Sequence, residues 1–139
     1  MSPTIQSIID IIKSCDDIQL ATFGLGEFPE TRHLTNAMNH NIVEIDLHFM
    51  TGVATPKYQQ LIKNPHCCIY YFNPITRRAV RLFGTMEIVA DAHARRGHWR
   101  DEYKSFGYSG ADDENFALLH FVPAEYKFYI GNEIQTNKI

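Results

Sequence analysis

The first regular pattern of apolar residues in the chain has the spacing of a helix. Isoleucines recur at the i, i+3, i+4, i+7 positions that place side chains on one face of an α-helix, at Ile5, Ile8, Ile9 and Ile12. Ser2 and Pro3 precede them, and this pair is typical of a helix start, since the hydroxyl caps free N–H groups and proline needs no N–H donor. We therefore predict a short amphipathic helix that begins near Ser2 and Pro3.

Period-2 alternation, typical of β-strands, follows in the next part of the chain. Residues 18–24 predict a first strand, and residues 31–39 predict a second. In this second strand, one face would carry Arg32, Leu34, Asn36 and Met38. Residues 43–51 alternate cleanly, and we expect them to pair with residues 31–39 across the Asn-rich turn MNHN.

The second half of the chain predicts further strands and two more helices. Helices are expected over 56–63 and from Asp91 to about Tyr103, and a bulge is expected at Gly84. The remaining strands are expected at 66–73, 77–90, 116–122 and 125–131, with Pro123 separating the last two. About seven strands, mostly antiparallel neighbours, predict a mainly β fold with short helices (α+β): a small antiparallel barrel, since closure removes exposed edges.

Composition narrows the class of protein. A chain of 139 residues is long enough for one core, so we expect a single domain over 1–139. The net charge of −3 offers no basic face for nucleic acid. The N-terminus lacks the pattern of a signal peptide, and no apolar run approaches the about 20 residues of a membrane span. Three cysteines form no disulfide framework, so we expect a cytoplasmic protein.

Candidate chemistry gathers where a strand meets a helix. Thr51 ends an apolar run, and Thr55 and Pro56 form a helix start followed by Lys57. Hydroxyls, a lysine and the free N–H groups of a helix start would stabilise an anion such as a phosphate. A Walker-type phosphate loop is excluded, because Gly52 stands alone. The alternative is a capped surface helix with a solvated lysine.

The order of elements around this junction resembles that of a known family. The matching segments are residues 21–37, 45–72 and 80–91, and residues 99–129 are similar to the tail of short general-stress proteins. Together they resemble the pyridoxamine 5'-phosphate oxidase-like, FMN-binding split-barrel family. The resemblance implies a split antiparallel β-barrel that forms a homodimer, with FMN held at the subunit interface.

The resemblance also implies which residues contact the cofactor. Arg32 and Lys57 match the strand arginine and the helix-start lysine that hold the FMN phosphate in this family. Six further residues would donate hydrogen bonds to the phosphate (Thr51, Thr55) or lie along the isoalloxazine edge (His33, Leu34, Thr35, Met50).

Two departures from the family bear on the activity. Ala79 stands where the oxidase carries a flavin-binding amide, so this contact is lost or is supplied by Arg81 or another chain. The C-terminal tryptophan and arginine of the oxidase have no match in GNEIQTNKI. We therefore expect a flavin-dependent oxidoreductase of unknown substrate and electron donor, without true pyridoxamine 5'-phosphate oxidase activity. The alternative is a non-catalytic module that binds or senses flavin, deazaflavin or haem.

The remaining candidate residues are more typical of side-chain packing than of a ligand or metal site. Trp99 and Tyr103 have i, i+4 spacing and either pack on the barrel or wall a flavin site. The role of residues 105–115, a polar loop, is open. We expect no metal site: His66 and the two cysteines after it alternate sides of a strand, and His93 and His98 do not share a helical face.

Overall fold

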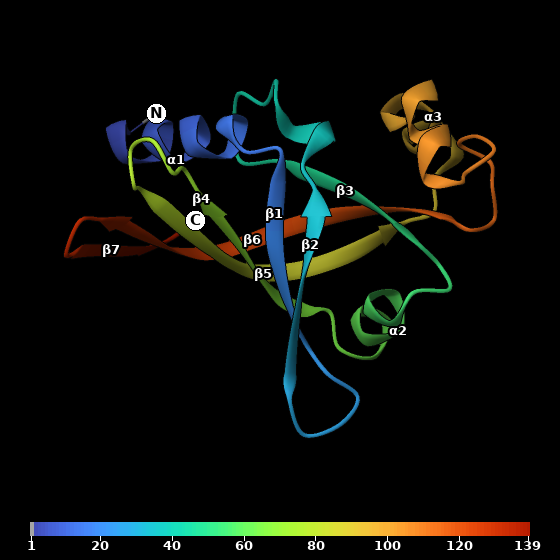
Figure 1. Ribbon diagram of the computed structural model, residues 1–139, viewed down its shortest axis with the longest axis horizontal. Coiled ribbons are helices and arrows are strands. Elements are labelled where there is room, and N and C mark those ends of the chain that lie inside the picture. The colour runs from blue at the N-terminus through green and yellow to red at the C-terminus, as the bar shows by residue number, and fades with distance from the viewer. Residues whose placement is uncertain (1) are drawn as a thin grey trace.

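The computed structural model describes residues 2–139, whose elements are shown in Figure 1. Seven antiparallel strands form one sheet in the order β2-β1-β4-β5-β6-β3, and β7 pairs with β6. The strands are β1 Asp17–Phe23, β2 Pro29–Thr35, β3 Leu47–Gly52, β4 His66–Phe72, β5 Ala79–Val89, β6 Phe116–Ile130 and β7 Glu133–Lys138. The helices are α1 Pro3–Ser14, α2 Pro56–Lys63 and α3 Ala92–His98, with 3-10 turns η1 Ala37–Asn39 and η2 Asp101–Phe106.

The sheet curls into a barrel that its end strands do not close. β2 and β3 lie near one another at the two ends of the strand order, yet neither is the hydrogen-bonded partner of the other (Figure 1). The predicted split antiparallel barrel is thereby confirmed. The split leaves one edge of each end strand without a strand partner, so this edge is open to side chains or ligands.

The two predicted helices near the N-terminus and at 56–63 are confirmed. The hydroxyl of Ser2 accepts a hydrogen bond from the N–H of Ile5 at 3.1 Å, as a helix cap does. The buried face of α1 packs over β4 and β5 and is made by Ile8, Ile9, Ile11 and Ile12. α2 covers 56–63, as predicted. None of the helices in residues 2–139 has the length and hydropathy that a membrane crossing requires.

The predicted hairpin of residues 31–39 with 43–51 is wrong. β2 ends at Thr35 and pairs only with β1, whereas β3 begins at Leu47 and pairs with β6. Two fully buried asparagines explain the difference, since their amides replace strand partners. Asn36 donates to the carbonyls of α1 residue Ile12 and of Cys15, both at 2.8 Å. Asn39 bonds the N–H and the C=O of His48, each at 2.9 Å, along the open edge of β3.

The bulge predicted at Gly84 is present, but two neighbouring boundaries differ from expectation. The pairing of β5 with β6 shifts between Phe83 and Gly84. A Cβ on Gly84 would clash with the carbonyl oxygen of Val122, so the two strands touch through their backbones. Pro123 lies opposite Gly84 and does not interrupt β6, because a bulge needs no N–H donor there. The predicted helix from Asp91 is shorter, since α3 ends at His98 and η2 follows.

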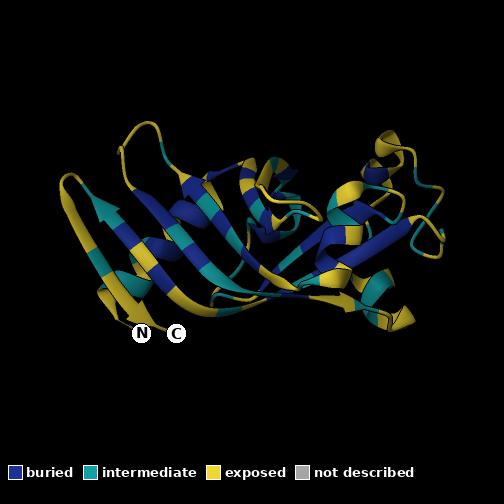
Figure 2. Ribbon diagram, turned by 90° about the horizontal axis from the view of Figure 1, so that it is seen from below, coloured by how far each residue is buried: buried dark blue, intermediate teal, exposed yellow. Residues whose placement is uncertain are grey.

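Residues 2–139 contain two apolar clusters, one on each face of β3. The large one fills the barrel and includes Phe49. The small one lies on the outer face beneath α3 and η2 and contains Met50, Tyr103, Phe116 and Leu118. Trp99 packs on it edge-on, with ring centroids 5.7 Å from Tyr103 and 5.2 Å from Phe116. Trp99 therefore packs on the barrel. Figure 2 shows the buried and exposed positions that alternate along the strands.

Candidate functional site

The split between β2 and β3 exposes a cation that is already partly bound. Arg32 on β2 donates from Nη1 to the carbonyl of Leu20 at 3.3 Å and to the hydroxyl of Thr22 at 2.8 Å, both on β1. Its Nη2 donates to Oε1 of Gln60 on α2 at 2.8 Å. Thr22 and Gln60 are themselves buried and hydrogen-bonded at 2.6 Å, so the guanidinium is held by neutral groups of two other elements.

The contacts of Arg32 leave part of its hydrogen-bonding capacity free. A guanidinium has about five N–H groups. The three bonds to Leu20, Thr22 and Gln60 use both N–H groups of Nη1 and one of Nη2. The N–H of Nε and the second N–H of Nη2 have no hydrogen-bond acceptor within residues 2–139. Such a pair of N–H groups can bind two oxygens of a phosphate or carboxylate at once.

Lys57 adds a second cation next to Arg32. Burial lowers the pKa of Lys57, and the positive charge of Arg32 lowers it further. Burial also lowers the pKa of Arg32, an effect that nearby Glu30 opposes. Within residues 2–139, neither cation has a carboxylate oxygen closer than 4.0 Å, the largest N–O distance of a salt bridge. Two partly desolvated like charges without a salt-bridge partner repel one another, so a bound anion would stabilise the pair.

The threonines of the strand-to-helix junction bond to one another. The hydroxyl of Thr55 donates to the carbonyl of Gly52 at 2.7 Å, and the hydroxyl of Thr51 lies 3.1 Å from that of Thr55. Thr55 is the N-cap residue of α2 and Pro56 follows at its start, as predicted, but the Thr55 side chain makes no cap hydrogen bond. The N–H groups at the start of α2 are therefore not used by this hydroxyl. Asn115 holds the loop through the N–H groups of Val53 and Ala54, at 2.9 and 3.3 Å.

The other residues predicted at the cofactor lie in different surroundings. His33 is exposed on β2, whereas the Leu34 side chain is buried in the barrel core, so only its backbone faces outward. The hydroxyl of Thr35 accepts from the N–H of Ala37 at 3.3 Å. The side chains of His33 and Thr35 lie on the opposite face of β2 from Arg32. Met50 lies on the opposite face of β3 from Thr51 and is buried in the outer cluster. Its side chain does not lie beside the other predicted contacts.

Sequence reasoning missed the residues that position Arg32. Thr22 and Gln60 are buried polar side chains, at 4% and 3% exposure, and Gln60 also donates to Glu30 at 2.9 Å. The only signal in the sequence was a glutamine next to Leu61 on the apolar side of a short helix. Such a position predicts burial but not the partner.

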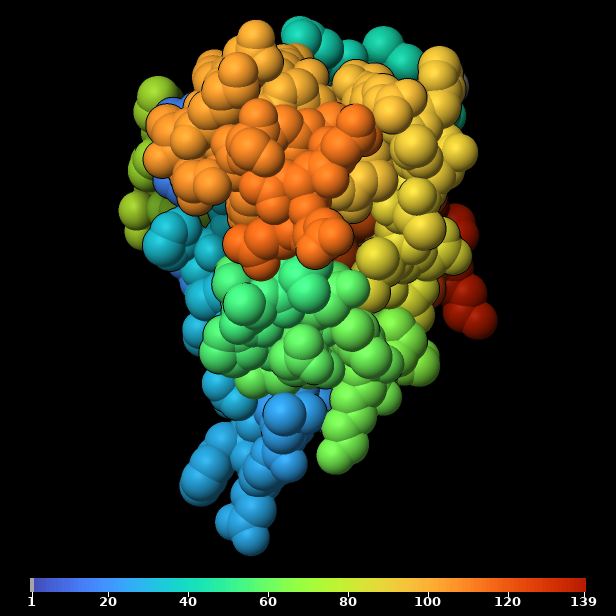
Figure 3. All heavy atoms as spheres, turned by 90° about the vertical axis from the view of Figure 1, so that its right-hand side faces the viewer, coloured from blue at the N-terminus to red at the C-terminus, as the bar shows by residue number. Residues whose placement is uncertain are grey.

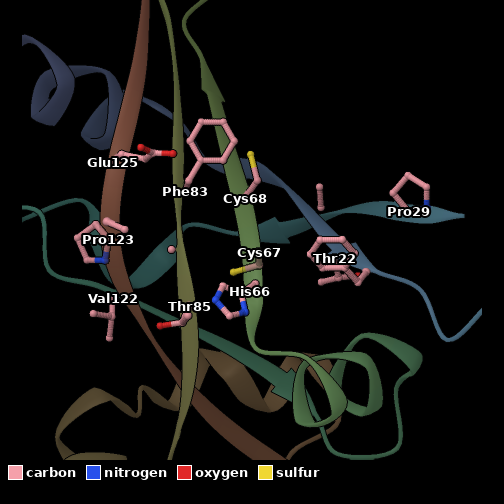
Figure 4. A pocket seen from close by; sticks show the side chains of 14 residues that line it. Thr22, Pro29, His66, Cys67, Cys68, Phe83, Thr85, Val122, Pro123 and Glu125 are labelled. Atoms are coloured by element: carbon pink, nitrogen blue, oxygen red, sulfur yellow. The ribbon is translucent and has the colours of Figure 1, made fainter. Parts of the chain in front are cut away.

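An apolar groove of about 530 Å³ adjoins this network on the outside of the sheet. Figure 4 shows the side chains that line it. Thr22 belongs to both the groove and the Arg32 network. The groove contains two thiols, but burial raises the pKa of Cys67 to about 12 and also raises that of Cys68. Both thiols are therefore protonated at neutral pH and offer no nucleophile. The other walls are formed by β5 and β6 residues, among them Phe83, Val122 and Pro123.

The position that departs from the family, Ala79, is buried on β5 at 4% exposure. Arg81, two residues on, donates from Nη1 to the hydroxyl of Tyr129 at 2.8 Å and lies 5.3 Å from the ring centroid of Tyr70. It thus has two tyrosine partners within its own chain.

A curled antiparallel sheet that is open between its end strands defines a split-barrel protein. The family model described as pyridoxamine 5'-phosphate oxidase like matches residues 4–136. The chain therefore belongs to the pyridoxamine 5'-phosphate oxidase-like family. A search of curated proteins finds no match.

Several solved structures share the fold. A Clostridium acetobutylicum protein related to general stress protein 26 of Bacillus subtilis has a TM-score of 0.84 and 21% identity, over 97% of this chain and 94% of that one. A pyridoxamine 5'-phosphate oxidase-related, FMN-binding protein from Nostoc punctiforme has a TM-score of 0.69 and 21% identity, over 100% and 97%. A haem-binding protein from Mycobacterium smegmatis has a TM-score of 0.78 and 14% identity, over 99% and 59%.

Proposed function

We propose that the protein is an FMN-binding homodimer that acts as a flavin-dependent oxidoreductase. The observation that carries the proposal is the pair of partly buried cations, Arg32 and Lys57, which have no salt-bridge partner in residues 2–139. A phosphate monoester supplies the missing negative charge. Family membership and the FMN-binding relative from Nostoc punctiforme support flavin mononucleotide as its bearer.

Each residue of the site has a separate task in this proposal. The free N–H groups of Arg32 would bind two phosphate oxygens, while Thr22 and Gln60 keep the guanidinium in place. Lys57 and the first N–H groups of α2 would hold the same phosphate from the other side. Bound flavin supplies hydride or electron transfer, so the chain needs to provide binding, orientation and access and no acid or base catalyst.

The homodimer is supported by apolar side chains that the single chain leaves in solvent. The tip of the β1–β2 hairpin (residues 23–29) carries Phe23, Leu25 and Phe28 at 58%, 55% and 77% exposure. Figure 3 shows this hairpin, in blue, projecting beyond α2. The apolar groove lies beside it, since Phe23 and Pro29 line the groove. A second copy of the chain would cover both, as exposed apolar patches of this kind usually mark an interface.

The phosphate assignment is tested by comparing FMN with riboflavin, which lacks only the phosphate. Loss of charge-assisted contacts should cost about 2–4 kcal/mol, or tens- to several-hundred-fold in affinity. Titration of flavin fluorescence with purified protein measures both affinities. Equal affinities for FMN and riboflavin would contradict the assignment of a phosphate site.

The assembly is tested by sedimentation. A dimer should sediment at about 32 kDa, twice the 16.0 kDa of the chain, and added FMN should raise its melting temperature. A monomer that binds one FMN per chain would contradict a site at the interface but not the fold.

A non-catalytic binding module is the second candidate, and the haem-binding relative from Mycobacterium smegmatis is the observation that favours it. The absorption spectrum of the purified protein, with mass spectrometry of the released ligand, separates flavin, deazaflavin and haem. Reduction of bound FMN by a nicotinamide nucleotide, followed by turnover with an electron acceptor, supports the oxidoreductase. A bound cofactor that no donor reduces supports the module.

A further inference from the structure

Three strands place a row of titratable side chains on the outer face of the barrel. His48 on β3 is directly opposite His120 on β6, and His120 is directly opposite Glu87 on β5. The rings of His48 and His120 are stacked, with centroids 4.7 Å apart. His48 lies on the same side of β3 as Met50, so this row borders the outer apolar cluster and faces away from the barrel core.

A third histidine reaches the row from α3. The ring of His98 has its centroid 4.0 Å from that of His48. Nδ1 of His98 lies 2.9 Å from the carbonyl oxygen of Ala94, and a carbonyl can only accept a hydrogen bond, so Nδ1 carries the proton. This tautomer leaves Nε2 of His98 with a free lone pair.

Two carboxylates complete the cluster, one at each nitrogen of His120. Oδ1 of Asp46 lies 2.7 Å from Nε2, and Oε2 of Glu87 lies 3.5 Å from Nδ1. One ligand atom from each of Asp46, His48 and His120 lies within 4.8 Å of the other two. Histidines that bind metals usually donate their second ring N–H to a carboxylate, which is the position of Glu87.

We propose that Asp46, His48 and His120 bind one divalent transition-metal ion of the Zn²⁺ class, with a water molecule as the fourth ligand. Two imidazoles and one carboxylate with a water molecule are a donor set of tetrahedral Zn²⁺ or Co²⁺ sites and do not suit Mg²⁺ or Ca²⁺. The ion would take the place of the hydrogen bond between Asp46 and His120. Asp46 can move to allow this, because its side chain is 53% exposed. The ion would tie β3 to β6, at a place that does not overlap the proposed phosphate site.

Binding of Co²⁺ and Zn²⁺ to the full chain, after treatment with a chelator, tests this site. We expect one ion per chain by calorimetry and visible absorption bands of tetrahedral Co²⁺. His120→Gln and Asp46→Asn should each abolish the bands, and exposed Asp46 makes the second variant safe for folding. The matched control is His93→Gln, an exposed histidine of α3 outside the cluster, which should bind as the unaltered chain does.

Glu87→Gln tests the positioning role of the outer carboxylate. It should keep the stoichiometry and weaken binding by about 10- to 100-fold, the usual effect of losing such a partner. Absence of saturable binding, or unchanged binding in both His120→Gln and Asp46→Asn, would overturn the proposal. Binding that is lost in Cys68→Ser instead would place the ion in the apolar groove and would overturn it as well. Flavin is absent from all these measurements, so their outcome is independent of the proposed function.

Discussion

The two faces of β3 carry opposite chemistry within a few residues. On the barrel side, Thr51 lies at the split beside two cations, and the site would attract an anion. On the outer side, His48 lies among imidazoles and carboxylates, and the cluster would attract a cation. Adjacent residues of a strand point to opposite faces, so a single strand can serve both sites. The position of a residue along the chain therefore does not indicate whether it belongs to the anion site or to the cation site.

The largest expected effect comes from loosening the strand that both faces share. Asn39→Ala removes the buried amide that bonds the N–H and C=O of His48 along the open edge of β3. Because both backbone groups then lack a partner, the free energy of unfolding should fall by about 2–4 kcal/mol. Urea denaturation measures the change, and FMN and Co²⁺ binding should both weaken.

Asn41→Ala is the matched control, since Asn41 is exposed in the same connection and should be replaceable without effect. A loss of binding on only one face of β3 in Asn39→Ala would show that the two faces do not depend on a common strand position.

A smaller effect should be confined to the barrel side. Lys57→Ala should weaken FMN binding by about 1–3 kcal/mol, because Arg32 and the helix N–H groups remain. The effect should shrink with added salt, to the extent that the site is open to solvent. Co²⁺ binding on the outer face should be unchanged. Fluorescence titration with FMN compares Lys57→Ala with Lys63→Ala, which replaces an exposed lysine in the last turn of α2. Equal affinities of the two variants would return Lys57 to the class of solvated surface lysines.

His48 on the outer face should make stability depend on pH between about 6.5 and 4 in the metal-free protein. An unfolded histidine takes up a proton below its ordinary pKa of about 6.5, whereas folded His48 does so only near 4. The unfolded state therefore binds more protons between these values, and stability falls as the pH drops from 6.5 towards 4. After allowance for solvent screening, the loss should be about 1–2 kcal/mol. Urea denaturation at several pH values should show a flatter profile in His48→Gln, and an equally steep profile would contradict the assignment.

The smallest expected effect compares two buried tyrosines. The hydroxyl of Tyr103, in the outer cluster, has no hydrogen-bond partner in residues 2–139, so Tyr103→Phe should change stability by less than about 1 kcal/mol. The hydroxyl of Tyr71, in the barrel core, donates to Asn36 at 2.9 Å, so Tyr71→Phe should cost about 1–2 kcal/mol. Thermal melts of both variants check the order, which a larger loss in Tyr103→Phe would reverse.

The sequence predicted the features that local rules govern. Helix starts, the bulge at Gly84 and the Arg32–Lys57 pair all depend on residue type and short spacing, or on family resemblance. The outer cluster could not be predicted in this way, because His48 and His120 are 72 residues apart and meet only through the register of β3 with β6. The false hairpin has a similar cause: alternation continues through Asn36, but long-range amide hydrogen bonds decide where β2 ends.

The backbone contact at Gly84 sets a limit on how this sequence can vary over evolutionary time. A clash with a side chain can be relieved by a second substitution, but the obstacle to a methyl group at Gly84 is the main-chain oxygen of Val122. No change of side chain on β6 removes that oxygen. Gly97 and Gly110 have open space around the corresponding position. In a deep mutational scan, Gly84 should therefore tolerate no other residue and have no compensating partner, while these two glycines should vary freely.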